Sequence, residues 1–527
     1  MRASFIDPAD GQVVPGSGAA GLVVQAIRTA GDDDVATVLG ALRAHGVPAG
    51  AVARVVERVA PAAAGAPQYR LAVEADRARE KRFSTLEQRV VEALEPVAGD
   101  VALLAASLGR MWSSDIDVLV RAAATDRASG LLADRGFLSL EPLLERLGRT
   151  TPGVVRFAAV QDDEVLGSAE LCRCLYDYGP DATPAIDAAA PAADGGIPLV
   201  GAAHRLQRTA GKVIASRRLT VRAALELLAA LERIGSVPST GDVAAALDRA
   251  AGLGRRIGAA DVFPDAPRRL TAADPRWLAA RSRSAHRLAV ERLRPRRMQV
   301  VFSGIDGAGK TTQVQRLAEN LGRLNVPSSI VWVRLGFSGS ALLSGSARLG
   351  QRLLPPRTHS AHPARASGLG EPNPLTRRGP IGWTWALANT LDYIRQARAA
   401  VRRGRGRVAI FDRSALDAAI ALDHDYGGAL ALRLHHRILQ AALPRPDRTF
   451  YLRLPAAVAY SRKEDMFSPS VLGALVDRYD RTFPGRAGVT ELDAQRPAGE
   501  LAVEVLRTLA DCSVLRDQPV AASITSE

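Results

Sequence analysis

The stretch Gly304–Thr312, which reads GIDGAGKTT, decides the fold of the C-terminal half of this chain. It follows the apolar run Gln299–Ser303 (QVVFS), which is typical of a buried strand. The segment after it carries apolar residues at helical spacing, at Val314, Leu317, Leu321 and Leu324. A strand, a glycine-rich loop and an amphipathic helix, in this order, are what a phosphate-binding loop requires. The sequence therefore predicts a nucleotide-handling domain in this half.

Each residue type in the loop has a physical reason. Glycines allow the tight turn that directs backbone N–H groups toward phosphate oxygens at a helix N-terminus, where the peptide dipoles favour an anion. We expect Lys310 to reach the β- and γ-phosphates of ATP and the Thr311 hydroxyl to ligate Mg²⁺. The chain has only four lysines, so a random match to this Walker A pattern is expected about 0.003 times per chain. The predicted nucleotide-binding residues are Gly304, Gly307, Ala308, Gly309, Lys310, Thr311 and Thr312.

The length and charge of the chain limit its domain number and its partners. At 527 residues it is too long for one core, and about 150 residues per domain suggests three or so units. The net charge is +14, and nearly all the basic residues are arginine. An arginine surplus serves phosphate recognition or reflects genome-wide composition, and we favour composition. We therefore expect a small-molecule nucleotide as partner, with nucleic acid unlikely and a homodimer left open.

Cysteine usage and the N-terminus indicate the compartment. The three cysteines, Cys172, Cys174 and Cys512, are too few for a disulfide framework and fit a reducing environment. The first two have no second pair with which to form a zinc site. Residues 1–16 contain no apolar signal core, and no stretch approaches the length of a membrane span. We expect a cytoplasmic protein without a membrane association.

Changes of pattern along the chain predict its domains. We expect a helical segment at 1–80, an α+β region with helical flanks and a helical extension at 81–253, a basic linker at 254–297, a domain at 298–512 and a tail at 513–527. Strands are predicted at 115–120, 154–160, 299–303, 329–333, 408–411, 449–454 and 489–492, and helices at 166–175, 204–216 and 221–234. The last five strands alternate with helices. That alternation predicts an α/β fold with a five-stranded, doubly wound parallel sheet.

Several motifs of the C-terminal half resemble one family. Gly304–Gln313 (GIDGAGKTTQ) is similar to the phosphate-binding loop of thymidylate kinases, with an Asp inside the loop and a Gln after the paired Thr. The similarity continues at Phe411–Arg413 (FDR), at Pro446–Leu452 (PDRTFYL) and at Leu492–Ala494 (LDA), and it covers roughly 297–510. The resemblance implies a P-loop NTPase fold and the transfer of a phosphoryl group from ATP·Mg²⁺ to a nucleoside monophosphate.

The resemblance also implies roles for single residues. Asp306 would contact the sugar hydroxyl of the acceptor, and Asp412 would orient Mg²⁺ or its water shell. Arg413 would clamp the acceptor phosphate. Arg462 and Lys463 match the lid, although a solvated helix end explains these two equally well. The predicted catalytic residues are thus Lys310, Arg413, Asp306 and Arg462, with Thr311 and Asp412 at the metal.

Departures from the family leave the acceptor open. Ser414 stands where thymidylate kinases usually have an aromatic residue, and Ala418–Leu422 (AAIAL) replaces their Ser followed by Ala-Tyr-Gln. Ala388–Asp392 (ANTLD) offers no equivalent of the base-binding Arg. One alternative is a kinase for another acceptor, in nucleotide-sugar or polysaccharide metabolism. Another is an ATP-binding regulatory protein, or a nucleic-acid-binding one, without turnover.

A second motif lies in the N-terminal half. In Ser113–Val120 (SSDIDVLV), Asp115 and Asp117 are two residues apart on a predicted strand, so their side chains share a face. Two such carboxylates can hold Mg²⁺ for nucleotidyl transfer. The string, with Arg110 before it, resembles the motif of the nucleotidyltransferase fold. The resemblance implies such a fold and a metal site at Asp115 and Asp117.

Two parts of that motif are missing from the sequence. The usual upstream Gly-Ser pair is absent, and the predicted strand 154–160 (VVRFAAV) has no third carboxylate. Asp162, Asp163 and Glu164 fall beyond the end of this strand. We therefore expect a nucleotidyltransferase-like domain that is degenerate, with an active one nearly as well supported.

Overall fold

The computed structural model describes residues 35–44, 48–53, 56–57, 60–104, 115–175, 181–192, 196–216, 297–332, 380–403, 407–426, 430–443, 445–462 and 469–511. The chain divides into two compact units, 1–295 and 296–527, and each is described by itself. Several expected features lie outside the described residues: Arg110, Ser113, Lys463, Cys512, the helix at 221–234, the linker up to 296 and the tail. None of the helices that the structure describes is long and apolar enough to cross a membrane.

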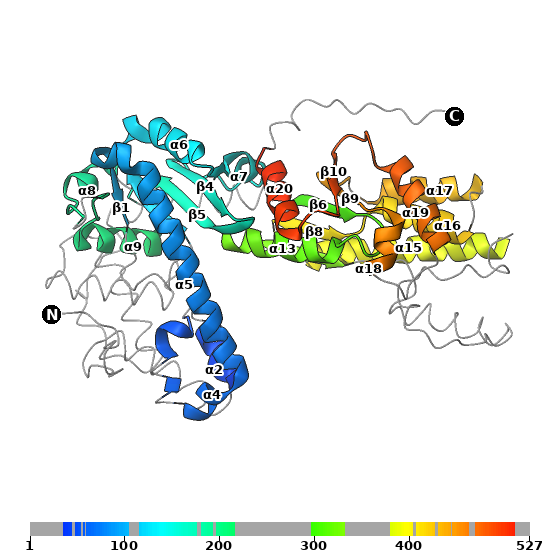
Figure 1. Cartoon of the computed structure of the whole chain (residues 1–527), viewed down its shortest axis with the longest axis horizontal. Helices are drawn as coiled ribbons and strands as arrows, with labels where there is room; N and C mark the ends of the chain where they lie inside the picture. The colour runs from blue at the N-terminus through cyan, green and yellow to red at the C-terminus, as the bar shows by residue number, and fades with distance from the viewer. Residues whose placement is uncertain are drawn as a thin grey trace, which may run out of the picture. The chain divides into compact units, whose positions relative to one another are not determined.

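One long helix organises the N-terminal unit. Helix α5 (Pro67–Leu94) begins with a proline at its first turn, where the missing N–H costs nothing, and runs for 28 residues. It spans the predicted boundary at 80/81, so no linker separates the segments there. The short helices α2 (Val35–Ala44) and α4 (Pro61–Gly65) pack at its N-terminal end (Figure 1).

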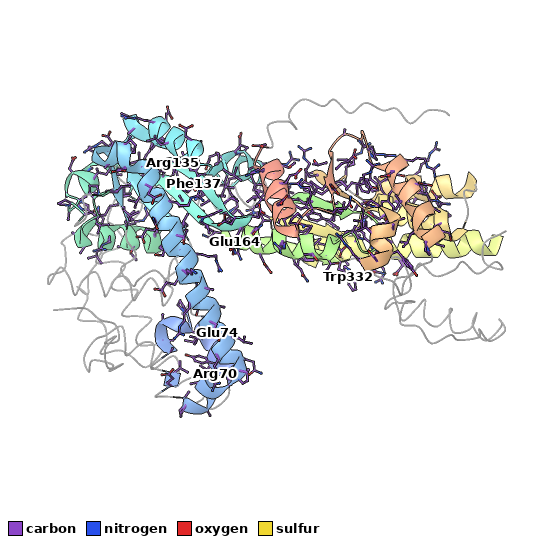
Figure 2. The ribbon with its side chains drawn as sticks, viewed as in Figure 1. Arg70, Glu74, Arg135, Phe137, Glu164 and Trp332 are labelled. Carbon is purple, nitrogen blue, oxygen red and sulfur yellow. The ribbon has the colours of Figure 1, made fainter. Side chains whose placement is uncertain are left out.

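Arg89 fixes α5 to the sheet of this unit. Its guanidinium donates hydrogen bonds to the carbonyl oxygens of Val160 at 2.7 Å and Arg135 at 2.9 Å. It also lies 5.0 Å from the centre of the Phe137 ring, a cation–π distance. Arg135 and Phe137 are labelled in Figure 2 beside this helix. One side chain therefore ties the helix to two segments of the unit.

The N-terminal sheet has five strands in the order β1-β2-β5-β4-β3. These are β1 (Val101–Leu103), β2 (Asp115–Val120), β3 (Leu138–Ser139), β4 (Val154–Gln161) and β5 (Glu164–Cys172). The strands predicted at 115–120 and 154–160 are confirmed as β2 and β4. Strand β5 is parallel to β2 and antiparallel to β4. It therefore has hydrogen-bonded neighbours on both sides.

The helix predicted at 166–175 is wrong, because this segment is strand β5. Its residues are buried on both faces of the sheet, so the apolar/polar alternation that marks a half-buried strand is lost. Asp162 and Asp163 form the turn between β4 and β5 with positive φ angles of 48° and 59°. Asp residues tolerate this left-handed backbone, which a two-residue hairpin needs. These acids therefore belong to the turn.

Both faces of this sheet are covered. One core contains Ile116, Val118, Ala169 and Leu171 and lies against α5 and α6 (Thr125–Asp134). The other contains Leu119 and Cys172 with residues of α8 (Thr183–Asp187). Helices α7 (Glu141–Arg146) and α9 (Ala202–Ser216) complete the described helices of this part.

The C-terminal unit contains a sheet of five parallel strands in the order β10-β9-β6-β8-β7. The strands are β6 (Met298–Ser303), β7 (Ser328–Trp332), β8 (Val408–Asp412), β9 (Arg448–Arg453) and β10 (Val489–Asp493). All five strands predicted here are confirmed, with ends within one residue. Their carboxyl ends share one edge of the sheet, where ligand sites of open α/β folds form.

Helices cover this sheet as well (Figure 1). They are α13 (Lys310–Arg323), α15 (Pro380–Arg403), α16 (Ala415–Tyr426), α17 (Leu430–Ala442), α18 (Ala456–Arg462), α19 (Pro469–Thr482) and α20 (Ala498–Ala510). Val301 and Phe411 pack against α15, α16 and α17 on one face. The alternate residues Val300, Phe302 and Ile410 are fully buried, so the other face is covered too. This agrees with the predicted α/β class.

Candidate functional site

The glycine-rich loop joins the central strand β6 directly to α13. Gly304, Gly307 and Gly309 have φ angles of 146°, 89° and 84°, which residues with a Cβ rarely adopt. Gly309 is the N-cap of α13. It has no side chain, so no side-chain oxygen of this residue caps the first N–H groups of the helix. Such a terminus favours an anion. Ala308 is buried, and Thr312 is exposed in the first helical turn.

Only glycine fits at the start of the loop. A Cβ on Gly304 would lie 2.6 Å from the carbonyl oxygen of Leu452 on β9, a backbone atom that cannot move aside. The loop therefore passes close to the neighbouring strand at this point. This contact places the loop at the carboxyl edge of the sheet.

Two cations meet one carboxylate inside the loop. Lys310 is only 6% exposed, and its Nζ donates to the Ile305 carbonyl at 2.7 Å and lies 3.5 Å from Asp306 Oδ1. The Arg413 guanidinium, from the end of β8, also binds Asp306 Oδ1. The structure thus brings together three predicted site residues. An anionic group between Lys310 and Arg413 is stabilised by both charges.

The surroundings shift the pKa values of these cations in opposite directions. Burial and the neighbouring charge of Arg413 lower the pKa of Lys310, although Asp306, Asp412 and Asp417 oppose them. For Arg413, burial lowers the pKa, but the nearby acids, Asp306 foremost, outweigh burial and raise it. Arg413 is therefore a fixed positive charge at this edge.

A hydroxyl and a carboxylate lie side by side next to the loop. Thr311 Oγ1 donates to Asp412 Oδ2 at 2.7 Å, and Asp412 is 5% exposed at the last position of β8. Mg²⁺ prefers hard oxygen ligands and binds through one or two protein groups plus phosphates. The donor set therefore fits a Mg²⁺ ion bound together with a nucleotide.

Arg413 has an unusual backbone. Its φ angle is +99°, a region that costs a non-glycine residue about 1–3 kcal/mol. Its N–H donates to the Phe302 carbonyl at 3.0 Å, which holds the turn after β8 against β6. The turn aims the side chain at the loop. Strain of this kind is found at sites where a side chain must point in one direction.

Arg462 reaches the loop from α18. Its Nη1 lies 3.1 Å from the Ala494 carbonyl and 3.5 Å from the Gly307 carbonyl. The side chain therefore reaches a carbonyl of the phosphate-binding loop while it remains exposed to solvent.

Sequence reasoning did not identify Asp417, a 2% exposed carboxylate near the loop. It accepts hydrogen bonds from the Ser303 hydroxyl at 2.6 Å and the Tyr479 hydroxyl at 2.9 Å. The spacing Ser414-x-x-Asp417 was a signal for it, since it is that of a capping box.

The N-terminal unit contains a second group of carboxylates. Asp115 and Asp117 share one face of β2, as predicted. Glu170 on β5 is the residue directly paired with Asp117. The expectation that no neighbouring strand carries a third carboxylate is therefore wrong. It failed because β4 was taken as the neighbour of β2 and β5 was read as a helix. Ligand atoms of Asp117, Glu170 and Cys172 lie within 4.8 Å of one another.

Basic side chains already neutralise this cluster. Arg208 of α9 is 6% exposed; its Nη2 lies 2.6 Å from Asp117 Oδ2, and its Nη1 donates to the Leu175 carbonyl at 2.6 Å. Lys212 Nζ lies 3.4 Å from the same Asp117 oxygen. Arg156 pairs with Glu170 at 2.7 Å. The cluster does not fit a Mg²⁺ ion unless Arg208 is displaced from Asp117.

The pKa values within the cluster reflect this pairing. Burial alone raises the pKa of Asp117, but Arg208 and Lys212 outweigh it and hold the pKa well below its usual range. Burial, followed by the charge of Asp117, raises the pKa of Glu170 to about 7. Burial also raises the pKa of the Cys172 thiol to about 12. Cys172 is therefore a neutral, buried thiol.

Arg208→Met is expected to lower the free energy of unfolding of the N-terminal unit by about 3–5 kcal/mol at pH 7, because it leaves Asp117 buried without its main partner. Lys212→Met, which removes a side chain that is 49% exposed, is the matched control and is expected to cost under about 1 kcal/mol. The measurement is a urea titration of the full chain, read by hydrogen exchange in β2 and β5.

The penalty for Arg208→Met also depends on pH. Without the guanidinium, burial raises the Asp117 pKa, so this carboxyl is protonated more readily in the folded state than in the unfolded chain. The loss of stability should therefore shrink as the pH falls. Equal losses in the arginine and lysine variants at pH 7 would contradict this account of the cluster.

Of the comparisons with known proteins, only the one with solved structures finds similarity. No protein-family model matches the chain, and no curated protein matches it. Among solved structures, it is similar to two of a deoxyadenosine kinase from M. mycoides, one with the products dCMP and a flexible dCDP, the other with dATP. The identities are 16% and 14% and the TM-scores 0.28 and 0.27. Each match covers 40% of this chain and 98% of the other. At these values the similarity adds nothing to the geometry described above.

Proposed function

We propose that the C-terminal unit transfers a phosphoryl group from ATP to a nucleoside monophosphate or a related phosphate acceptor, with Mg²⁺ as cofactor. One observation carries this proposal: Lys310 and Arg413 converge on the Asp306 carboxylate at a glycine-rich helix N-terminus. Phosphoryl transfer needs positioning and the neutralisation of spreading negative charge, more than covalent chemistry from the protein. A buried lysine and a half-buried arginine beside an anion-binding loop supply both.

Each residue then has a definable task. The backbone N–H groups of residues 307–312 would bind the polyphosphate of ATP, and Lys310 would leave Asp306 to contact the β- and γ-phosphates. Arg413 would hold the acceptor phosphate in line. Thr311 and Asp412 would hold Mg²⁺, which when bound neutralises phosphate charge.

The chemistry of the nearby carboxylates favours a phosphate acceptor over a free hydroxyl. A hydroxyl acceptor needs a general base, whereas an oxygen of a phosphate monoester attacks as an anion. Asp306 is bound by two cations, Asp412 accepts from Thr311, and Asp417 accepts from several donors. Asp412 and Asp417 are therefore not poised to remove a proton, and Asp306 would be released only when its two cations turn to the phosphates. The acceptor oxygen would form a bond to the γ-phosphorus as the bond to the ADP oxygen breaks.

A screen of acceptors tests the proposal. The full chain is incubated with ATP and Mg²⁺, and ADP release is measured with nucleoside monophosphates, with the matching nucleosides and with sugar phosphates. We expect release that depends on one or a few monophosphates. Turnover with nucleosides alone would overturn the choice of acceptor, and ATP binding without any acceptor-dependent release would favour the regulatory alternative. Turnover with a sugar phosphate would favour a role in nucleotide-sugar or polysaccharide metabolism.

For the N-terminal unit we propose a degenerate nucleotidyltransferase-like domain. Its three carboxylates support the likeness, while the contact between Arg208 and Asp117 argues against metal-dependent turnover. Nucleotidyl transfer by this unit, measured as pyrophosphate release from nucleoside triphosphates, is therefore expected to be absent.

Arg462→Ala is expected to raise the KM for ATP about 10–100-fold, because a charged donor beside the loop is lost. Arg481→Ala is the matched control, because it removes an exposed arginine of α19 whose Nε donates to the Asp477 carbonyl of the same helix. Steady-state kinetics with the acceptor found in the screen give the measurement. Equal KM values for ATP in the two variants would show that Arg462 does not contribute to nucleotide binding.

A further inference from the structure

A buried carboxylate that the proposed mechanism does not use connects three parts of the C-terminal unit. Asp417 lies in the first turn of α16 and is 2% exposed. Its Oδ2 accepts hydrogen bonds from the Ser303 hydroxyl and from the Ser414 N–H and hydroxyl, each at 2.6 Å. Its Oδ1 accepts from the Tyr479 hydroxyl at 2.9 Å and, more weakly, from the Gly304 N–H at 3.4 Å.

Capping of α16 explains only part of this arrangement. The Ser414 hydroxyl accepts from the N–H groups of Leu416 and Asp417, both at 3.1 Å, while Asp417 accepts from the Ser414 N–H. Together these contacts form a capping box, which needs no residue outside the helix start. The contacts with Ser303, Gly304 and Tyr479 come from β6, the loop and α19. They are not needed to cap a helix.

The position of these contacts points to the reacting groups. Ser303 and Gly304 are where β6 becomes the phosphate-binding loop. Ser414 follows directly after Arg413, whose backbone is held at a φ angle of +99°. One carboxylate therefore ties the start of the loop to the turn that aims Arg413. Both segments carry groups on which the proposed transfer depends.

We propose that Asp417 is a positioning residue, which fixes the phosphate-binding loop, the Arg413 turn and α19 relative to one another. Its effect on turnover rests on the proposed function, whereas its effect on the loop does not. The phosphate-binding loop and the turn that carries Arg413 meet at this carboxylate. A shift of about 1 Å between reacting groups can cost about 10²-fold in rate.

Asp417→Asn is the sharpest test, because the shape stays the same while one oxygen becomes an NH₂ group. Each Asp417 oxygen faces a backbone N–H, from Ser414 on one side and Gly304 on the other. Hydroxyl groups can turn to accept a hydrogen bond, but N–H groups cannot. The amide oxygen should keep the 2.6 Å contact with Ser414, so the NH₂ group faces the Gly304 N–H and pushes the loop away, while the Tyr479 hydroxyl can turn to accept from it.

We expect kcat of Asp417→Asn to fall about 10²-fold, with the Kd for ATP changed less than about threefold. The N–H groups of residues 307–312 remain, which explains the retained affinity. Ser414→Ala is the control: it breaks the capping box but leaves the contacts of Asp417 with Ser303, Gly304 and Tyr479. It should lower Tm by about 2–4 °C with kcat close to that of the wild type.

Tyr479→Phe tests the same anchor more gently. The ring stays stacked against Tyr451 and Phe483, with centroids at 6.1 and 5.6 Å, so packing is preserved. Only the hydroxyl contact with Asp417 is removed. We expect kcat to fall about 3–10-fold at an unchanged Kd for ATP. This variant keeps the proposal testable if Asp417→Asn does not fold.

Hydrogen exchange separates this inference from the proposed function. Peptides that cover residues 303–309 and 412–414 should exchange at least about tenfold faster in Asp417→Asn than in the wild type, and at wild-type rates in Ser414→Ala. This readout needs no acceptor, so it stands even if the acceptor screen fails. Unchanged exchange of these peptides, together with wild-type kcat in both Asp417→Asn and Tyr479→Phe, would overturn the positioning role.

Discussion

Lys310→Ala is expected to reduce phosphoryl transfer from ATP by at least about 10²–10³-fold. The substitution removes a buried ammonium group that binds both the loop carbonyl of Ile305 and the Asp306 carboxylate. In the proposed reaction, that charge turns to the phosphates, where the negative charge develops. Transfer is measured as acceptor-dependent ADP formation, and affinity as the Kd for ATP.

Lys81→Ala is the matched control, because Lys81 is an exposed lysine of α5 in the other unit. It should leave ADP formation unchanged. Lys310→Ala should also leave hydrogen exchange in the N-terminal sheet at wild-type rates, since that sheet belongs to a separate unit. A Lys310→Ala variant that retains near-normal kcat and Kd would show that the glycine-rich loop does not bind the transferred phosphate.

Replacing Arg413 is expected to lower kcat about 10³-fold or more, the scale seen when an arginine that stabilises a transferring phosphoryl group is lost. Two substitutions separate its side chain from its backbone. Alanine removes the guanidinium but keeps the unfavourable φ angle of +99°, whereas glycine removes both the guanidinium and the strain. Both variants should lose turnover equally. Arg413→Gly should be more stable than Arg413→Ala by about 1 kcal/mol.

Both variants, Arg413→Ala and Arg413→Gly, are measured in two ways: urea unfolding of the C-terminal unit gives their stabilities, and steady-state kinetics give their turnover. Equal stabilities would mean that the turn after β8 relaxes in the alanine variant, so that its backbone stores no strain. A glycine variant that retains turnover would mean that the guanidinium has no part in catalysis. Arg413→Lys should recover little activity, because an ammonium group cannot make the bidentate hydrogen bonds that a guanidinium makes to a phosphate.

The fold of the C-terminal unit could be predicted because its signals are local. Each strand is a short apolar run, and the glycine pattern of 304–309 dictates a loop between a strand and a helix whatever the rest of the chain does. The pairing of Asp306 with Arg413 is different. These residues are far apart in sequence, and only the order of strands β6 and β8 brings them together.

The N-terminal unit shows where such signals fail. Strand β5 has neighbours on both sides and is buried on both faces, so its residues lack the alternation that marks a strand. Missing β5 also hid Glu170. The partner of Asp117 could not be foreseen either, because Arg208 comes from α9, and a sequence motif for carboxylates contains no information about a distant cation.

Asp417 lies between these two cases. Its spacing from Ser414 predicts a capping box, which is a local property. The contact with Tyr479 depends on how α19 packs against α16 and β9, which no short motif encodes. The capping contacts were therefore within reach of a local sequence pattern that was not used, whereas the anchor of the loop is evident only from the structure.

Label transfer from [γ-³²P]ATP tests the central claim most directly. The full chain and its Lys310→Ala variant are incubated with labelled ATP, Mg²⁺ and each nucleoside monophosphate in turn, and the products are separated. We predict that label appears in a nucleoside diphosphate with the wild type and is absent with the variant. Wild-type protein that binds ATP but transfers label to no monophosphate, or a variant that transfers as well as the wild type, would contradict it.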